Sequence, residues 1–277
     1  MKTNILLPTD FSDNAWSAVV YALKLYKDEV CTFYFLHSTK MKISAMSNLS
    51  NKLIHFMTEN ATKELLELKE LAENADANAN HEFEIIVSTN DLFHTMETVI
   101  EKNNIDIVVM GTKGATKATE IVFGSNTVNA IKKVKICPIL AVPDEFDFDD
   151  PKQIAFPTDF NRLYGEELHA LKRIADLYDS KIRIVHINKE TELSEAQEYN
   201  LDQLKIALKN YDYSFHWMPD YGKKHEAIKD FIDELNINIL VMINYKHSFI
   251  HSIIKEPVIK KLGFQPTIPF LVIPSIN

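Results

Sequence analysis

The sequence predicts an α/β protein made of two tandem doubly wound domains, each with a five-stranded parallel sheet flanked by helices. Three observations lead to this fold class. Four segments recur in the same order, short apolar runs alternate with longer helical patterns, and the apolar runs lack the polar alternation of half-exposed strands. Strands that are buried on both faces are typical of parallel sheets covered by helices on each side.

The repeat gives the domain organisation. NILLPTDFSDNA (4–15) matches QIAFPTDFNRLY (153–164) at an offset of 149, and TFYFLHS (32–38) matches RIVHIN (183–188) at the same offset. NNIDIVVMG (103–111) matches LNINILVMI (235–243) at an offset of 132, and CPILAVP (137–143) matches IPFLVIP (268–274). Four ordered matches indicate a duplicated domain. We expect domains at 1–146 and 151–277, joined by an acidic linker within 143–151.

The first copy contains five apolar runs of strand length. They predict strands near 3–8, 30–37, 83–88, 106–110 and 138–142. The longer segments between them predict helices near 12–27, 48–75, 91–103 and 124–134. Helix 48–75 carries an apolar stripe, which predicts core packing: Leu53, Phe56, Met57, Leu65, Leu68 and Leu71.

The second copy repeats the pattern. Its strands are expected near 153–157, 181–187, 212–218, 237–243 and 269–273, with a shorter second helix near 194–210. In doubly wound sheets, ligands bind beyond the carboxyl ends of the strands, where the strand order reverses. The PTDF segment follows strand one and a glycine-rich stretch follows strand four. If these strands are neighbours, both segments meet at one crevice.

The glycine-rich stretch of the first copy reads MGTKGATKATEIVFGSNT (110–127). Gly111 ends a buried strand and allows a sharp turn, and Gly114 allows close backbone approach or a positive φ. Gly124 and Ser125 open the next helix, where free N–H groups and the helix dipole favour an anion. The Ser125 hydroxyl could bind phosphate or cap the helix. Ordinary loop glycines with a serine cap are the open alternative to a phosphate site.

The combination resembles the universal stress protein family. Its ATP-binding members carry Gly-x2-Gly-x9-Gly-Ser/Thr after strand four, which Gly111 to Ser125 match without a gap, and a Pro-Thr-Asp-Phe-Ser segment after strand one, here Pro8 to Ser12. A histidine follows strand two, here His37. The resemblance covers both copies and implies a tandem universal stress protein with the adenine nucleotide alpha hydrolase-like fold.

The resemblance also implies a nucleotide site in the first copy. Adenine and ribose contacts carry over to Pro8, Thr9, Asp10, Ser38, Met110 and Gly111. Phosphate contacts carry over to Gly114, Gly124, Ser125, Asn126 and Thr127. Asn126 departs from the family, which commonly has a small apolar residue there. The implied ligand is ATP with Mg²⁺ or Mn²⁺, bound by a cytoplasmic regulatory protein and not turned over by a dedicated enzyme.

Several readings stay open. Asp10 is either a nucleotide contact or the N-cap of helix 12–27. His37 and His186 end matching strands, and a structural role is favoured because both copies keep the residue. An ATP-independent interaction module and slow ATP hydrolysis are the alternative functions. The fifth strands are expected to pair as an intramolecular pseudo-dimer, with a homodimer as a further option.

The second copy lacks the glycines. Asn244, Tyr245 and Lys246 replace the turn, and Glu256-Pro257 replaces Gly124-Ser125, so a carboxylate and a missing donor stand where phosphate would bind. We expect no ATP binding there. His247 and His251 share a helical spacing, but we favour solvent-exposed or capping roles over a metal site.

Composition limits the partners. The net charge of −9 disfavours nucleic acid, and no apolar run approaches the length of a membrane span, so neither partner is expected. Cys31 and Cys137 lie in apolar strands, which predicts two buried free thiols.

Overall fold

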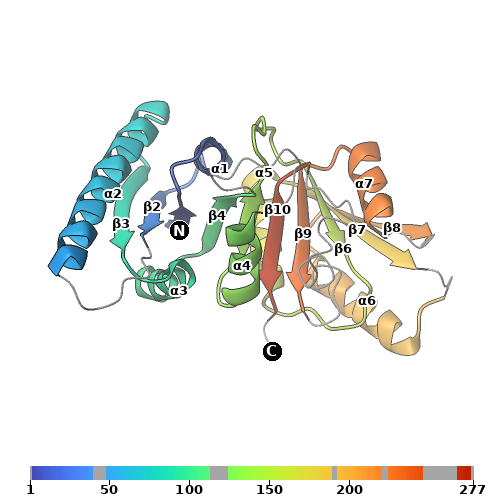
Figure 1. The fold of residues 1–277 in the computed structure, drawn as a ribbon. Helices are drawn as coiled ribbons and strands as arrows, with labels where there is room; N and C mark the ends of the chain where they lie inside the picture. Colours follow the sequence, from blue (N-terminus) through green and yellow to red (C-terminus); the bar gives the residue numbers. More distant parts are fainter. Residues whose placement is uncertain are drawn as a thin grey trace. The chain divides into compact units, whose positions relative to one another are not determined.

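The structure, a computed structural model, describes residues 2–39, 48–112, 124–188, 192–219, 224–245 and 267–275. The chain divides into two compact units, Met1–Asp147 and Phe148–Asn277 (Figure 1). The division falls inside the acidic segment 143–151. Each unit is an α/β structure that can be described by itself.

Unit 1 alternates strands and helices from one end to the other. The strands are β1 (Thr3–Pro8), β2 (Cys31–Ser38), β3 (His81–Ser88), β4 (Ile107–Gly111) and β5 (Ile139–Val142). The helices are α1 (Asp13–Leu25), α2 (Asn48–Ala75), α3 (Leu92–Asn103) and α4 (Ser125–Lys133). All strand pairs are parallel, in the order β3-β2-β1-β4-β5. The order reverses between β1 and β4, which places a switch point there.

Unit 2 repeats this order. Its strands are β6 (Gln153–Pro157), β7 (Lys181–Asn188), β8 (Tyr213–Pro219), β9 (Ile239–Asn244) and β10 (Phe270–Pro274). Its described helices are α5 (Leu168–Tyr178), α6 (Glu195–Ala207) and α7 (Lys224–Glu234). The parallel order β10-β9-β6-β7-β8 is that of unit 1 with the strands renumbered. The predicted fold class is therefore confirmed.

The cores explain why these runs form buried strands. The five residues of β4 are all buried, and Ile5, Leu6 and Leu7 of β1 are at most 1% exposed. Neither strand alternates, because helices cover both faces of the sheet. The same holds in β9, where Ile239 to Ile243 are buried. Cys31 and Cys137 are buried free thiols, as predicted.

Helix α2 corrects one expectation. Leu65 and Leu68 are buried, but Leu53, Phe56 and Leu71 are 47%, 59% and 57% exposed, so the predicted stripe is only partly core. Helix α2 has 28 residues, a length of about 42 Å at 1.5 Å per residue. The eight-residue strands β2 and β3 span only about 26 Å. The helix is too long for the sheet that it covers.

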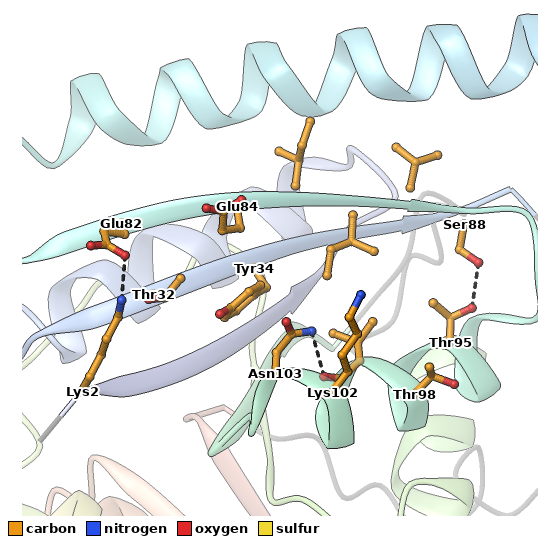
Figure 2. Close-up of a pocket in the computed structure, with 14 residues that line it drawn as sticks. Lys2, Thr32, Tyr34, Glu82, Glu84, Ser88, Thr95, Thr98, Lys102 and Asn103 are labelled. Atoms are coloured by element: carbon orange, nitrogen blue, oxygen red, sulfur yellow. Dashed lines mark hydrogen bonds and ion pairs between the residues drawn. The ribbon is translucent and has the colours of Figure 1, made fainter.

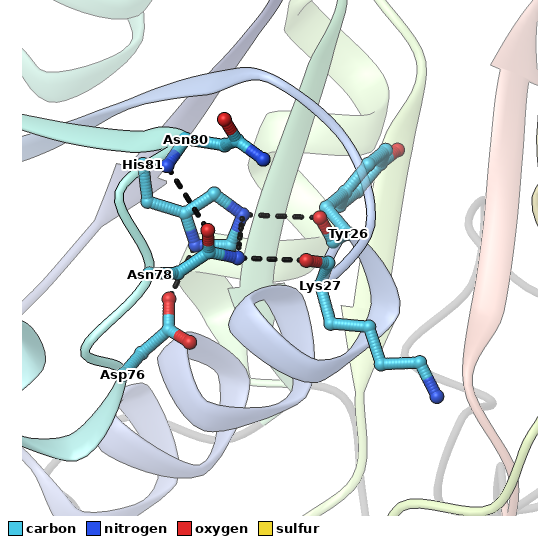
Figure 3. Close-up of polar contacts among 6 residues, drawn as sticks. All are labelled: Tyr26, Lys27, Asp76, Asn78, Asn80 and His81. Carbon is cyan, nitrogen blue, oxygen red and sulfur yellow. Dashed lines mark hydrogen bonds and ion pairs between the residues drawn. The ribbon is translucent and has the colours of Figure 1, made fainter.

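A polar cluster joins α1 to the start of β3 (Figure 3). The side chain of His81 is fully buried, and its Nδ1 bonds the carboxylate of Asp76. Its Nε2 lies 3.0 Å from the carbonyl oxygen of Tyr26, just after α1. The amide of Asn78 donates to the carbonyl of Lys27 at 2.7 Å. The cluster holds the α2–β3 turn against the end of α1.

Candidate functional site

The switch point of unit 1 contains a small pocket. β1 pairs directly with β4, so Pro8 and Gly111 end neighbouring strands. The pocket beyond these ends has a volume of about 90 Å³. Eight of the predicted site residues line it: Pro8, Thr9, Asp10, Ser38, Met110, Gly111, Asn126 and Thr127. Two segments that lie a hundred residues apart in the sequence thus meet at one crevice.

The turn after β1 is held by its own side chains. The Thr9 hydroxyl accepts a hydrogen bond from the Phe11 N–H at 3.0 Å, and Phe11 adopts a left-handed φ of 61°. The Asp10 carboxylate accepts from the Ser12 N–H at 3.2 Å and from the Ser12 hydroxyl at 2.6 Å. Such short side-chain bonds stabilise a tight turn. Asp10 therefore reaches the pocket from a fixed backbone.

Asp10 is not the helix cap. The N-cap of α1 is Ser12, whose hydroxyl accepts from the Ala15 N–H at 3.2 Å. The alternative that Asp10 caps this helix was wrong, because the cap lies two residues later. Asp10 instead orients the capping serine. Aspartate and serine are both favoured caps, so the local sequence alone could not separate them.

Gly111 is required by packing. A Cβ atom built on this residue would lie 2.4 Å from Oδ1 and 2.8 Å from the backbone oxygen of Asn14. Buried Ala15, Ala18 and Ala22 line the inner face of α1, which packs against β4. The sequence suggested that Gly111 permits a sharp turn, but its φ does not lie in the left-handed region that favours glycine. The glycine instead lets the start of α1 approach the strand.

The start of α4 provides backbone donors near the pocket. Gly124 is the N-cap, and its own N–H donates to the carbonyl of Thr112. No side chain caps the helix, so the alternative that Ser125 caps it is wrong. Ser125 and Asn126 are exposed. The first N–H groups of a helix have no acceptor within it, and the dipole there is positive.

Two hydroxyls of the predicted set already have structural partners. Thr127 is buried and donates to the carbonyl of Gly111 at 2.8 Å, which ties α4 to the end of β4. The Ser38 hydroxyl donates to the carbonyl of Asn90 at 2.6 Å. Gly114 lies outside the described residues, as do Lys246, His247, His251, Glu256 and Pro257.

Three further residues line the pocket: Ala15, His37 and Leu92. Ala15 begins the buried face of α1, and Leu92 is the first residue of α3. Neither carries a sequence signal for a site, because their place depends on where the helices dock. His37 did carry one, since it ends β2 and matches His186, but its recurrence favoured a structural role.

Unit 2 keeps the turn and fills the crevice. The Thr158 hydroxyl accepts from the Phe160 N–H at 3.1 Å, and Phe160 has a φ of 55°, as in unit 1. Asp159, the counterpart of Asp10, accepts from the hydroxyl of Tyr245 at 2.7 Å. Tyr245 directly follows β9, where the glycine loop begins in unit 1. The Asp159 carboxylate is thus hydrogen-bonded to a side chain of its own unit.

A longer loop before α5 supplies the rest of the filling. The Tyr164 hydroxyl lies 2.6 Å from that of Thr158, and the Arg162 guanidinium lies over the rings of Tyr164 and Tyr245 at 5.9 and 5.2 Å. Arg162 also pairs with the buried carboxylate of Glu167. Burial raises the pKa of Tyr164 and of Tyr245, in each case as the main cause. Both phenols are therefore neutral parts of the packing.

A wider groove lies on another face of unit 1 (Figure 2). It has a volume of about 510 Å³ and runs between α3 and the face of β2 and β3 that is turned away from α2. Lys2 and Glu82 form an exposed ion pair of 2.7 Å at one end. None of the predicted site residues lines this groove. The polar residues that line this groove lie outside the PTDF segment and the glycine-rich stretch.

The described part of the chain lacks two kinds of feature. No helix in it is both long and apolar enough to cross a membrane. No group of three or more histidine, cysteine, aspartate or glutamate side chains in it is placed to hold a metal ion.

Comparison with known proteins identifies the family. The model of the universal stress protein family matches residues 1–143, so this chain belongs to that family. Universal stress protein MJ0577 of Methanocaldococcus jannaschii is 30% identical over 159 residues, which cover 51% of this chain and 95% of that protein. MJ0531 of the same organism is 28% identical over 141 residues, covering 50% and 80%.

A solved structure extends the likeness to both units. The crystal structure of a universal stress protein from Archaeoglobus fulgidus has a TM-score of 0.70 and 19% identity. The match covers 99% of this chain and 97% of that one. At this identity the likeness shows the fold alone. It agrees with the tandem arrangement that the sequence repeat predicts.

Proposed function

We propose that unit 1 binds ATP and that the protein acts as a nucleotide-dependent regulatory member of its family. The observation that carries this proposal is the pocket at the β1–β4 switch point. It brings the PTDF turn, the end of β4 and the start of α4 together. Ligand binding at such a point is the general behaviour of doubly wound sheets.

The pocket is too small to enclose the whole nucleotide. A volume of about 90 Å³ accommodates part of a nucleoside and not a whole triphosphate. Ser125 and Asn126 are exposed residues of the first turn of α4, where backbone N–H groups and the helix dipole favour negative charge. The phosphates would therefore lie outside the enclosed part, against α4, with the nucleoside towards the ends of β1 and β2.

A divalent cation would be held mainly by the nucleotide. Asp10 is the one carboxylate among the described residues that line the pocket, and it already accepts two hydrogen bonds from Ser12. Mg²⁺ commonly keeps several waters and binds through substrate phosphates. The residues here thus fit a cation that arrives with ATP, and they do not form a site of their own.

Calorimetric titration of ATP with Mg²⁺ into the full chain tests the proposal. Gly124→Asp and Gly124→Asn form a matched pair, because the φ of −59° suits both side chains and both cap helices well. A carboxylate about 4 Å from a phosphate charge costs up to ~4 kcal/mol near a protein surface. We expect Gly124→Asp to lose roughly tenfold or more in affinity and Gly124→Asn to lose little. Equal binding by both variants would contradict the site.

We infer that unit 2 does not bind ATP. The Tyr245–Asp159 hydrogen bond and the Arg162–Glu167 pair support this inference, because they use the groups at the equivalent crevice. The expected stoichiometry is one nucleotide per chain, at the site that Gly124→Asp weakens. A second site, whose affinity Gly124→Asp leaves unchanged, would overturn the inference.

We propose binding without efficient turnover. Of the pocket side chains that could act as a base, Asp10 is engaged by Ser12, and His37 lies near the end of β2, away from α4, where we expect the phosphates. General base catalysis needs a group within reach of the attacking water. Phosphate release measured with excess Mg²⁺ should stay near the rate without protein. A rapid release that Gly124→Asp abolishes would instead establish an ATPase.

A further inference from the structure

His37 presents one ring nitrogen in a fixed way. Its Nδ1 lies 2.8 Å from the carbonyl oxygen of Thr9, and its ring packs on Phe11 with centroids 4.5 Å apart. A carbonyl only accepts, so Nδ1 must carry a proton. In the neutral ring, Nε2 is then the acceptor nitrogen. The hydrogen bonds among the described residues engage only Nδ1 of this ring.

Comparison of His37 with His186, the matching histidine of unit 2, shows which contacts the two residues share and which differ. Nδ1 of His186 lies 2.9 Å from the Thr158 carbonyl, and its ring stacks on Phe160 at 4.8 Å. The shared contacts hold the turn in both units. His186, however, is 3% exposed and packs against the ring of Trp217 at 5.1 Å. His37 is only half-buried and lines the pocket.

The position of His37 indicates which part of a nucleotide it meets. β2 and β4 are separated by β1, so their ends lie about 10 Å apart at two strand spacings. The phosphate-binding end of the site is at α4, beyond β4. His37 at the end of β2 is on the other side of the pocket, where the nucleoside would lie.

We propose that Nε2 of His37 accepts a hydrogen bond from a donor on the nucleoside, either the exocyclic amine of adenine or a ribose hydroxyl. This inference rests on the proposed function of unit 1. His37 is then a specificity-determining residue as well as part of the turn. In unit 2 the same residue keeps only the structural role.

Replacement of His37 by asparagine isolates Nε2. The asparagine amide can still donate to the Thr9 carbonyl from the place of Nδ1, but it has no atom at the place of Nε2. The test is a calorimetric titration of ATP, inosine triphosphate, 2′-deoxy-ATP and 3′-deoxy-ATP into the unsubstituted full chain and into the His37→Asn variant. One hydrogen bond corresponds to a loss of about five- to tenfold in ATP affinity.

The analogues distinguish the two donors. If the amine is the donor, His37→Asn weakens ATP and leaves inosine triphosphate unchanged, because that base has a carbonyl in place of the amine. If a ribose hydroxyl is the donor, His37→Asn lowers the affinity for both ATP and inosine triphosphate. The affinity for the deoxy analogue that lacks this hydroxyl is then unaffected. Equal ATP affinity, or the same loss for all four ligands, would overturn the proposal. His186→Asn is the control and should leave every affinity unchanged.

A second measurement does not depend on the variant folding. The ¹⁵N resonance of Nε2 in the unsubstituted protein should shift upfield when ATP binds, because the nitrogen lone pair accepts a proton donor. An unchanged resonance under saturating ATP would overturn the inference alone. Absence of ATP binding to the unsubstituted chain would instead overturn the proposed function.

Discussion

Gly111 illustrates how one residue links packing to the candidate site. Its Cβ position is filled by Asn14 of α1, and its carbonyl accepts from Thr127 of α4. Both helices that flank the pocket are therefore positioned against the same residue. A change here would disturb the PTDF turn and the α4 start together.

We expect Gly111→Ala to lower the free energy of unfolding by about 1–3 kcal/mol, the usual cost of overpacking. The reason is the 2.8 Å approach to the backbone of Asn14, which cannot move as a side chain could. Urea denaturation of the full chain measures the loss. Gly165→Ala is the matched control, since its Cβ would meet only Glu167 Oε2 at 3.3 Å. Similar losses in both variants would contradict this account.

The buried hydroxyl of Thr127 ties the first turn of helix α4 to the end of β4. We expect Thr127→Val to destabilise unit 1 by about 1–3 kcal/mol, because the Gly111 carbonyl loses its buried donor. Thr127→Ser keeps the hydroxyl and should lose much less. Chemical denaturation compares the two. A valine variant as stable as the serine variant would show that the bond contributes nothing.

The loop before α5 makes unit 2 sensitive to alkali. Burial raises the pKa of Tyr164 and Tyr245 in the folded chain, whereas an unfolded tyrosine titrates near about pH 10. The stability that both phenols contribute is thus present below pH ~10 and is lost as the pH rises above it. We expect tyrosinate absorbance to report these groups only when unit 2 unfolds.

Tyr245→Phe provides the comparison for that titration. It keeps the ring under Arg162 but removes one ionisable group and its bond to Asp159. The pH dependence of unfolding should therefore become shallower, although the variant starts from a lower stability at neutral pH. An unchanged slope would mean that Tyr245 ionises freely in the folded chain.

At the scale of the whole molecule, the two units should respond differently to nucleotide. Saturating MgATP at 100 times its dissociation constant would stabilise the binding unit by ~2.7 kcal/mol. We expect amide hydrogen exchange to slow within Met1–Asp147 and to stay unchanged within Phe148–Asn277. Equal protection of both units would contradict a single site in unit 1.

The sequence predicted most of the secondary structure because its signals are local. The strand runs lie within two residues of the observed strands, and β1 and β6 match at both ends. The site residues, the ATP ligand, the pairing of the fifth strands and the cytoplasmic location stay predictions. The cap alternatives at Asp10 and Ser125 were wrong, because several favoured cap residues stand side by side in the sequence. The predicted stripe of α2 was partly wrong, because the exposure of Leu53, Phe56 and Leu71 depends on packing partners distant in sequence.

The sequence by itself determined the duplication, the succession of strands and helices along each unit, and the segments that follow β1 and β4. Periodicity and turn chemistry carry that information within a few residues. Only the tertiary structure decided that Asn14 abuts Gly111, that His37 borders the pocket and that Tyr245 meets Asp159. Each of these contacts joins side chains from separate elements, so it depends on how the helices and strands pack and not on local sequence.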